Sequence, residues 1–247
     1  MKIVAIIPAR YGSTRFPGKP LAKIAGKPMI QHVVERAAKS ARLSEVCVAT
    51  DDERIMTCVV GFGGKAIMTS AMHSSGTDRV YEAAMAIGLD PDDVVVNIQG
   101  DQPLFPPVVI GKLLEPLEQD PEVDMSTLYF PVFGEEEANN PNHVKVVVDS
   151  RGYALYFSRA PIPYYRGEDN RLEYAKHLGI YAYRMEFLSV FTKLPPGRLE
   201  KAEKLEQLRA LEQGFRIKVI ESPVDSVEVD VAEDIAHVEN LLRTTQF

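Results

Sequence analysis

The sequence has few cysteines and no long apolar run, and each shortage excludes a class of protein. Cys47 and Cys58 are too few for a disulfide framework, and each lies in an apolar segment that favours a buried, reduced thiol. No stretch approaches the roughly 20 apolar residues of a membrane span. Pro8 and Arg10 interrupt the first apolar run, which is too short for a signal peptide. We therefore expect a cytoplasmic protein with no membrane partner.

Basic residues are also scarce. The 247 residues include 28 lysines and arginines against 35 aspartates and glutamates, which gives a net charge of −7. Proteins that bind the phosphate backbone of nucleic acids normally carry a basic surface excess, so no nucleic-acid partner is expected. The chain is long enough to bury one large core, and it contains no linker or low-complexity tract. These features favour a single domain over residues 1–247.

Three cations nevertheless gather in one loop near the N-terminus. Residues 8–20 contain Arg10, Arg15 and Lys19 together with two glycines, directly after the apolar run 3–7. The run is short, β-branched and uninterrupted, which is typical of a strand buried on both faces of a parallel sheet. A strand, a glycine-containing loop and a helix form the usual nucleotide-holding geometry of open α/β sheets. The loop therefore predicts a phosphate-rich ligand.

The remaining patterns predict an α/β fold whose two halves differ. In the first half, strands at 46–50 and 94–99 alternate with helices that begin at Pro28, at 51–53 with an acidic first turn, after the polar run 73–79 and at 106–107. In the second half the expected strands are separated by turns, which predicts a mixed, partly antiparallel portion of the sheet. These strands are expected at 125–132, 144–149, 153–158, 179–183, 217–220 and 227–230. Two further helices are expected at 199–212, with Glu200 and Lys204 as an i,i+4 pair, and at 232–242.

The cationic loop resembles a P-loop but does not match one. Five residues separate Gly12 from Gly18, and Pro20 stands where the Mg²⁺-binding hydroxyl belongs. Proline also removes a backbone N–H from the phosphate cradle. The dinucleotide fingerprint G-x-G-x-x-G is absent as well. We therefore expect side-chain charges to bind the phosphates, and carboxylates elsewhere in the chain to bind Mg²⁺.

Asp101 and Asp230 are the candidates for these metal ligands. Each follows an apolar strand pattern, and ligands of open parallel sheets lie outside the carboxyl ends of the strands. Mg²⁺ prefers one or two carboxylates with phosphate oxygens and water, so two aspartates suffice. Two structural alternatives stay open, because Asp230 with Glu233 fits a helix cap and Asp101 fits an ordinary turn. Glu228 shares a strand face with Asp230 and is a further candidate.

Five segments resemble the 3-deoxy-manno-octulosonate cytidylyltransferase family, the CMP-Kdo synthetases. They are PARYGSTRFPGKPL at 8–21, QGDQP at 99–103, YALYFSR at 153–159, KHLGIY at 176–181 and EKLEQLR at 203–209. The resemblance spans nearly the whole chain. It implies an α/β fold of the nucleotide-diphospho-sugar transferase-like (Rossmann-like) type, in which a mixed sheet forms the middle of three α/β/α layers. It also implies a homodimer. It also implies that CTP and Kdo react with Mg²⁺ to give CMP-Kdo and pyrophosphate for lipopolysaccharide synthesis.

The resemblance also implies roles for individual residues. The catalytic group would be Arg10, Lys19, Asp101 and Asp230, and the two aspartates would bind the metal. The nucleotide would contact Pro8, Ala9, Arg10, Ser13, Arg15, Lys19, Ser75, Thr77, Arg79 and Gln99. The sugar acid would contact a set with one guanidinium suited to a carboxylate, Arg159, His177, Tyr181, Glu206 and Gln207. Structural alternatives are packing at a strand start for His177 and Tyr181 and a solvated helix face for Glu206 and Gln207.

Several positions depart from the family pattern. Gln102 stands where a glutamate is common, and residues 226–232 differ around the second aspartate. One branch of the family activates 8-amino-3,8-dideoxy-manno-octulosonate, and its pattern near this aspartate resembles Glu228, so this sugar is the alternative substrate. Two other classes stay open. In a glycosyltransferase, residues 228–230 would replace an Asp-x-Asp motif, and a nucleotide sensor would bind CTP without turnover.

Overall fold

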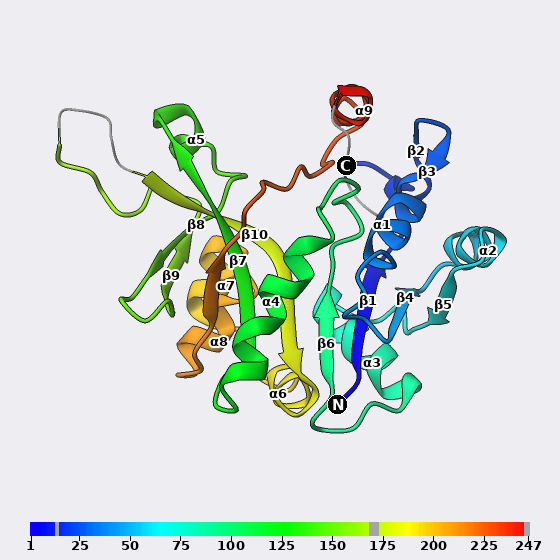
Figure 1. Ribbon diagram of the computed structural model, residues 1–247, viewed down its shortest axis with the longest axis horizontal. Coiled ribbons are helices and arrows are strands. Elements are labelled where there is room, and N and C mark those ends of the chain that lie inside the picture. The colour runs from blue at the N-terminus through cyan, green and yellow to red at the C-terminus, as the bar shows by residue number, and fades with distance from the viewer. Residues whose placement is uncertain (13–14, 168–172, 245–247) are drawn as a thin grey trace. The chain divides into compact units, whose positions relative to one another are not determined.

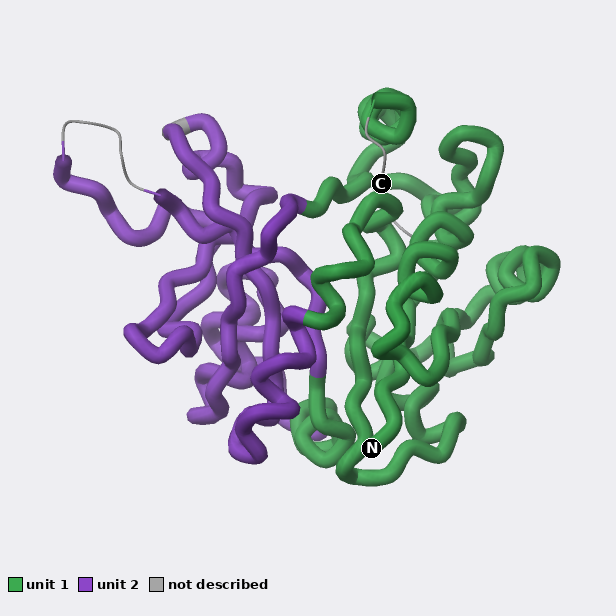
Figure 2. Tube along the Cα trace, in the orientation of Figure 1, with its two compact units in different colours: residues 1–111, 183–192, 226–247 green, residues 112–182, 193–225 purple. Residues whose placement is uncertain are grey.

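The structure is a computed structural model that describes residues 1–12, 15–167 and 173–244. Its contacts divide the chain into two compact units, which Figure 2 distinguishes by colour. Unit 1 comprises Met1–Gly111, Tyr183–Thr192 and Ser226–Phe247, and unit 2 comprises Lys112–Ala182 and Lys193–Asp225. The single domain expected from the sequence stays a prediction.

Unit 1 is built on four parallel strands (Figure 1). β1 (Ile3–Ala9) lies between β4 (Glu45–Thr50) and β6 (Val94–Asn97), and β5 (Lys65–Met68) adds to the free side of β4. The apolar residues at the start of β1 are buried, as expected for a central strand whose two faces are covered. Because the strands run in parallel, the loops that follow β1 and β6 leave the sheet at the same edge.

Three helices follow these strands in the order that the sequence predicts, α1 (Met29–Ala37), α2 (Glu53–Gly61) and α3 (Gly76–Ile87). The Asp52 side chain caps α2 by accepting from Arg54 N, and the Ser75 hydroxyl caps α3 by accepting from Asp78 N. The predicted helix with acidic residues 51–53 at its start is confirmed by α2, whereas α3 begins at Gly76, inside the polar run 73–79 rather than after it. Unit 1 also contains a 3-10 helix and shorter elements, η1 (Lys19–Leu21), β2 (Lys23–Ile24), β3 (Lys27–Pro28), α6 (Met185–Phe191) and α9 (Asp234–Thr244).

Unit 2 contains the antiparallel strands that the second half of the sequence predicts. β7 (Met125–Phe133) lies between β11 (Lys218–Glu221), which is parallel to it, and β10 (Glu173–Arg184), whose last two residues belong to unit 1. The antiparallel pairs join β8 (Lys145–Val148) to β10 and to β9 (Ala154–Ser158). The helices are α5 (Glu135–Asn139), α7 (Arg198–Glu203) and α8 (Leu208–Glu212), and α4 (Val108–Gln119) runs along the chain from unit 1 into unit 2.

Two predicted elements are wrong. The helix expected over 199–212 is broken into α7 and α8, because Lys204 has a φ of 55°, in the left-handed region that a helix cannot continue through. Glu200 pairs with Arg209 at 2.6 Å instead of with Lys204. The strand expected over 227–230 is an irregular segment instead.

The composition predicted buried thiols and no membrane span, and the structure can be compared with both expectations. Cys47 on β4 is buried, and this burial raises the pKa of its thiol to about 12. Cys58 is half-buried, so the expectation of a buried thiol holds fully for Cys47 alone. Among the helices of the described residues, none combines the length and the apolar composition needed to cross a membrane.

Candidate functional site

A pocket in unit 1 collects most of the residues predicted to contact a nucleotide. It lies where β1 and β6 end and α3 begins, and it is lined by Pro8, Ala9, Arg10, Arg15, Lys19, Pro20, His73, Ser74, Ser75, Gly76, Arg79, Gln99, Gly100 and Asp101. Of the predicted nucleotide residues that the structure describes, Thr77 alone is not in this lining, and it is buried. Ser13 lies outside the described residues. The edge of the parallel sheet thus carries a strongly cationic hollow.

The backbone of the cationic loop explains its glycine and its proline. Gly18 N donates to Tyr11 O at 2.9 Å, and Gly18 itself has a φ of 73°, which glycine adopts without strain. The chain then enters the 3-10 helix η1, in whose first turn Pro20 needs no backbone N–H. The loop is therefore not a P-loop. Lys19 is the first residue of a short helix, and its side chain is held by contacts to other segments of the chain.

Lys19 lies among three oxygen atoms from two distant segments. Its Nζ is 2.7 Å from Asp101 Oδ2, 2.8 Å from Val229 O and 3.9 Å from Asp230 Oδ1. Arg15 Nη2 approaches the same oxygen of Asp230 at 3.0 Å. The two predicted metal aspartates therefore face one cation, although 129 positions separate them in the numbering (230 − 101).

Two contacts hold these aspartate segments in place. A Cβ at Gly100 would lie 3.1 Å from Pro8 O, so glycine lets the loop of Asp101 approach the end of β1 closely. Val229 N donates to Asp101 O at 2.9 Å, and the Val229 side chain is fully buried in an apolar cluster with Met29 and other residues. The position of Asp230 is thus fixed by a buried neighbour rather than by a strand.

Gln102 and Glu228 join the same two segments. Gln102 is fully buried, and its Nε2 donates to Glu228 Oε1 at 2.9 Å. A glutamate at position 102 would place a second carboxylate against Glu228, which is itself exposed, and the two like charges would repel. The two departures from the family pattern are therefore complementary. Glu228 is engaged by Gln102 in the structure, and its prediction as a metal ligand stays a prediction.

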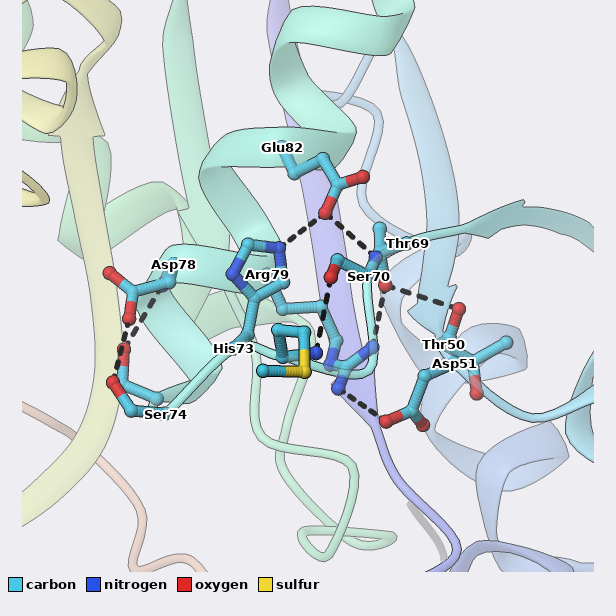
Figure 3. Close-up of polar contacts among 11 residues, drawn as sticks. Thr50, Asp51, Thr69, Ser70, His73, Ser74, Asp78, Arg79 and Glu82 are labelled. Atoms are coloured by element: carbon cyan, nitrogen blue, oxygen red, sulfur yellow. Dashed lines mark hydrogen bonds and ion pairs between the residues drawn. The ribbon is translucent and has the colours of Figure 1, made fainter.

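Arg10 and Arg79 differ in how much charge they offer to a ligand. Arg10 is exposed, and within the described residues no acidic side chain pairs with it. Arg79 is buried, and its guanidinium donates to Asp51 Oδ2 at 2.8 Å and to Thr69 Oγ1 at 2.6 Å (Figure 3). Because Asp51 compensates its charge, Arg79 shapes the wall of the pocket more than it attracts phosphate.

His73 is a pocket residue that was not predicted as a site residue. Figure 3 shows its ring directed at Glu82 of α3, and one carboxylate oxygen of Glu82 accepts from both His73 Nε2 and Ser70 N. The hydrogen bond from Ser70 N, with a smaller contribution from His73, lowers the pKa of the Glu82 carboxyl. The sequence signal that could have indicated His73 is its place in the polar run 73–79. That run is interpreted as the start of a helix, which leaves no reason to assign His73 to a site.

The site residues offer the type of ligand atom that a Mg²⁺ ion prefers. Asp101 and Asp230 present carboxylate oxygens toward one point, and Val229 adds a carbonyl oxygen there, which are the hard ligands that Mg²⁺ prefers. Among the described residues, no three side chains of histidine, cysteine, aspartate or glutamate gather closely enough to hold a metal alone. Two carboxylates therefore match a metal that completes its shell with phosphate oxygens and water.

The predicted sugar residues lie in unit 2, and Arg159 is tightly held there. Its Nε donates to Glu203 O and its Nη1 to Pro141 O, both at 2.8 Å, and its backbone N donates to Glu203 Oε2 at 3.0 Å. Lys145 Nζ donates in turn to Arg159 O at 2.8 Å. These side-chain contacts are to neutral carbonyls, so the charge of the guanidinium is not cancelled by them. An anion can therefore still be attracted to Arg159.

Of the other four predicted sugar residues, three are buried and Glu206 is half-buried. His177 and Tyr181 are buried on β10, where their rings lie 5.5 Å apart. Glu206 and Gln207 lie in the turn between α7 and α8, and Gln207 is buried. The helix-face alternative is therefore wrong for this pair, because there is no continuous helix at their position.

The buried His177 predicts a measurable pH dependence of stability. Burial lowers its pKa to about 3, from 6.5 in an unfolded chain, so the folded protein keeps the ring neutral. Between these values the unfolded state binds a proton that the folded state does not, and stability is lost as pH falls through this window. We expect His177 to cost about 1.4 kcal/mol of unfolding free energy per pH unit below pH 6.5.

Denaturant unfolding at several pH values between 6.5 and 4 measures this slope. His177→Gln removes the titrating group, so its unfolding free energy should fall less steeply with pH than that of the wild type, and the difference isolates the histidine from the carboxylates. Parallel curves for the two proteins would show that His177 does not carry the effect.

Comparison with known proteins assigns the chain to a family. The sequence profile of the cytidylyltransferases matches residues 4–220. The chain belongs to the cytidylyltransferase family. A 3-deoxy-manno-octulosonate cytidylyltransferase of Desulfatibacillum aliphaticivorans is 57% identical over 243 residues, which cover 98% of this chain and 99% of the relative. An 8-amino-3,8-dideoxy-manno-octulosonate cytidylyltransferase of Shewanella piezotolerans is also 57% identical, over 95% of this chain and 96% of the relative.

Solved structures agree with this assignment. A CMP:2-keto-3-deoxy-manno-octonic acid synthetase complexed with CTP superposes with a TM-score of 0.92 at 46% identity, covering 99% of both chains. A cytidylyltransferase of Leptospira borgpetersenii has a TM-score of 0.66 at 17% identity, which shows the shared fold alone. The predicted family and the predicted α/β fold class are thereby confirmed for this cytidylyltransferase.

Proposed function

We propose that this cytidylyltransferase activates Kdo with CTP and releases CMP-Kdo and pyrophosphate. The observation that carries the proposal is the pocket at the edge of the parallel sheet, where Arg10, Arg15 and Lys19 gather beside Asp101. Cations suit a triphosphate, and a carboxylate beside them suits its metal ion. The relatives named as cytidylyltransferases of octulosonate sugars, and the CTP complex of a structural neighbour, support the same reaction.

The reaction is a direct displacement at phosphorus. The oxygen of the anomeric C2 hydroxyl of the sugar forms a bond to the α-phosphorus of CTP, the bond from that phosphorus to the α,β-bridging oxygen breaks, and the hydroxyl proton is released. Pyrophosphate takes the electron pair of the broken bond. No covalent enzyme intermediate is proposed, because residues 8–12 and 15–20, the described part of the cationic loop, contain no serine, threonine or cysteine nucleophile.

The chain's own residues would act by positioning and by charge. Arg10 and Lys19 would bind the phosphates and stabilise the charge that develops on the leaving pyrophosphate. Asp101 and Asp230 would hold Mg²⁺, which when bound neutralises phosphate oxygens. Pro8, Ala9, Ser75 and Gln99 of the pocket lining would surround the rest of the nucleotide. Ser13 and Thr77 are further proposed nucleotide contacts, on the resemblance alone. In unit 2, Arg159 would bind the sugar carboxylate, and His177, Tyr181, Glu206 and Gln207 would bind its hydroxyls.

The resemblance supports three further proposals about the working protein. It would be a homodimer, it would act in the cytoplasm, and its product would serve lipopolysaccharide synthesis. The acidic net charge and the lack of a membrane-spanning helix among the described residues are compatible with these proposals.

The second candidate is the same reaction on 8-amino-3,8-dideoxy-manno-octulosonate. Relatives named for this sugar match the chain as well as relatives named for Kdo do, at 57% identity in each case. A pyrophosphate-release assay with both sugars and all four nucleoside triphosphates tests the two candidates together. We expect CTP with Kdo to give the highest kcat/KM. A higher value with the amino sugar would replace Kdo as the substrate, and no release with either sugar would overturn the proposed function.

A further inference from the structure

We propose that Lys19 has a second role, as a tethered counter-ion that occupies the metal seat between Asp101 and Asp230 until a nucleotide draws it away. The inference rests on the proposed function, because it assumes that these aspartates bind the Mg²⁺ that accompanies CTP. Its consequence is that the enzyme binds metal weakly without nucleotide and more tightly with it. Lys19 would thus regulate the order in which the site fills.

The geometry of the seat carries this inference. The ammonium of Lys19 has three oxygens around it, from Asp101, Asp230 and the Val229 carbonyl, at 2.7, 3.9 and 2.8 Å. Its side chain is only 13% exposed, so the ammonium is well enclosed by these groups. The same three oxygens are the hard ligands that a Mg²⁺ ion would use. Ammonium and metal therefore compete for one set of ligands.

The two cations cannot share the seat. Mg²⁺ binds its oxygens at about 2.1 Å, so a metal on Asp101 Oδ2 would lie within about 5 Å of the Lys19 ammonium, which is 2.7 Å from the same oxygen. Like charges at this distance repel strongly in a site that is partly screened from water. Metal binding therefore requires the Lys19 side chain to leave Asp101, which adds an energetic cost to metal binding in the free enzyme.

A triphosphate offers Lys19 an alternative partner. Lys19 lines the pocket together with Arg10, whose charge no acidic side chain of the described residues compensates. A lysine has a flexible stem and a compact charge, so its ammonium can exchange a carboxylate for a phosphate with little change in the backbone.

The exchange couples the two ligands in both directions. If CTP removes Lys19 from the seat and thereby raises metal affinity, the metal must raise CTP affinity by the same factor. The substitution Lys19→Met removes the competing cation and keeps the apolar stem. The free site of this variant then holds two carboxylates whose nearest remaining cation is the exposed Arg15. Its affinity for a divalent metal should rise, although its affinity for nucleotide should fall.

Titration with Mn²⁺ in the absence of nucleotide and sugar tests the inference, with the electron paramagnetic resonance signal of free Mn²⁺ as the readout. We expect Lys19→Met to bind Mn²⁺ about tenfold more tightly than the wild type, a factor within the usual range of such couplings. Lys23→Met is the matched control, because Lys23 is exposed on β2 and should leave Mn²⁺ affinity unchanged. Equal or weaker binding by Lys19→Met than by the wild type would overturn the inference.

A second variant covers the case in which Lys19→Met does not fold. Lys19→Gln removes the charge and keeps a polar end, and it should also bind Mn²⁺ more tightly than the wild type. The titration contains neither substrate, so its failure would leave pyrophosphate release by the wild type untouched. Conversely, a wild type that releases no pyrophosphate would overturn the proposed function while the Mn²⁺ titration remained readable.

Discussion

Replacement of Asp101 by asparagine is expected to lower kcat/KM for pyrophosphate release by about three orders of magnitude. The Asp101 carboxylate is the best-placed anion of the site, 2.7 Å from Lys19 Nζ. Asparagine keeps its size and an acceptor oxygen for Lys19, but it has no negative charge to offer a metal ion. The measurement is steady-state kinetics at saturating Mg²⁺, with circular dichroism to show that the fold is kept.

The matched control for this variant is Asp92→Asn. Asp92 is an exposed aspartate in the turn before β6, away from the pocket lining, so its loss should change kcat/KM by less than about twofold. Asp230→Asn should resemble Asp101→Asn. Near-normal turnover by Asp101→Asn at high Mg²⁺ would contradict the assignment of the two aspartates to the metal.

Replacement of Lys145 by methionine is expected to lower the free energy of unfolding by about 3 kcal/mol or more. Lys145 is fully buried, and its Nζ donates to three carbonyl oxygens, those of Asn140, His143 and Arg159, at 3.0, 2.6 and 2.8 Å. Burial, with repulsion from Arg159, lowers the pKa of this ammonium. Methionine fills the space, but it removes the lysine donor from all three carbonyls, of which Asn140 O keeps a backbone donor, His143 N at 3.1 Å.

Urea unfolding measures the loss, and Lys112→Met provides the comparison. Lys112 is exposed on α4 and pairs only at the surface with Glu115, so its replacement should change stability by less than about 0.5 kcal/mol. A Lys145→Met protein as stable as the Lys112→Met protein would show that the three carbonyls find other partners. It would also remove the stated support for the position of Arg159.

The sequence predicted the parts of the fold that short-range patterns determine. The uninterrupted apolar residues 3–7 specified a buried parallel strand, and β1 has that position. The polar run at 73–79 specified a helix start, and Ser75 caps α3 there. The gathering of Arg10, Arg15 and Lys19 in one loop indicated an anion pocket, and all three line one pocket in the structure.

The features that the sequence did not predict depend on contacts between distant residues. The left-handed conformation of Lys204 breaks a helix that the leucine spacing favours, and Leu205 is buried beyond the break. The seat of Lys19 between two aspartates joins segments that are up to 211 residues apart (230 − 19). The burial of Lys145 also has no local signal, since a lone lysine in a strand is usually exposed.

The most direct test of the proposed cytidylyl transfer follows phosphorus by nuclear magnetic resonance. The purified protein is incubated with CTP, Kdo and Mg²⁺, and the ³¹P resonances are recorded over time. The account predicts that the three signals of CTP disappear together while pyrophosphate and one phosphodiester signal of CMP-Kdo appear in equal amounts. Unchanged CTP, or its conversion to CDP and phosphate without a phosphodiester, would contradict it.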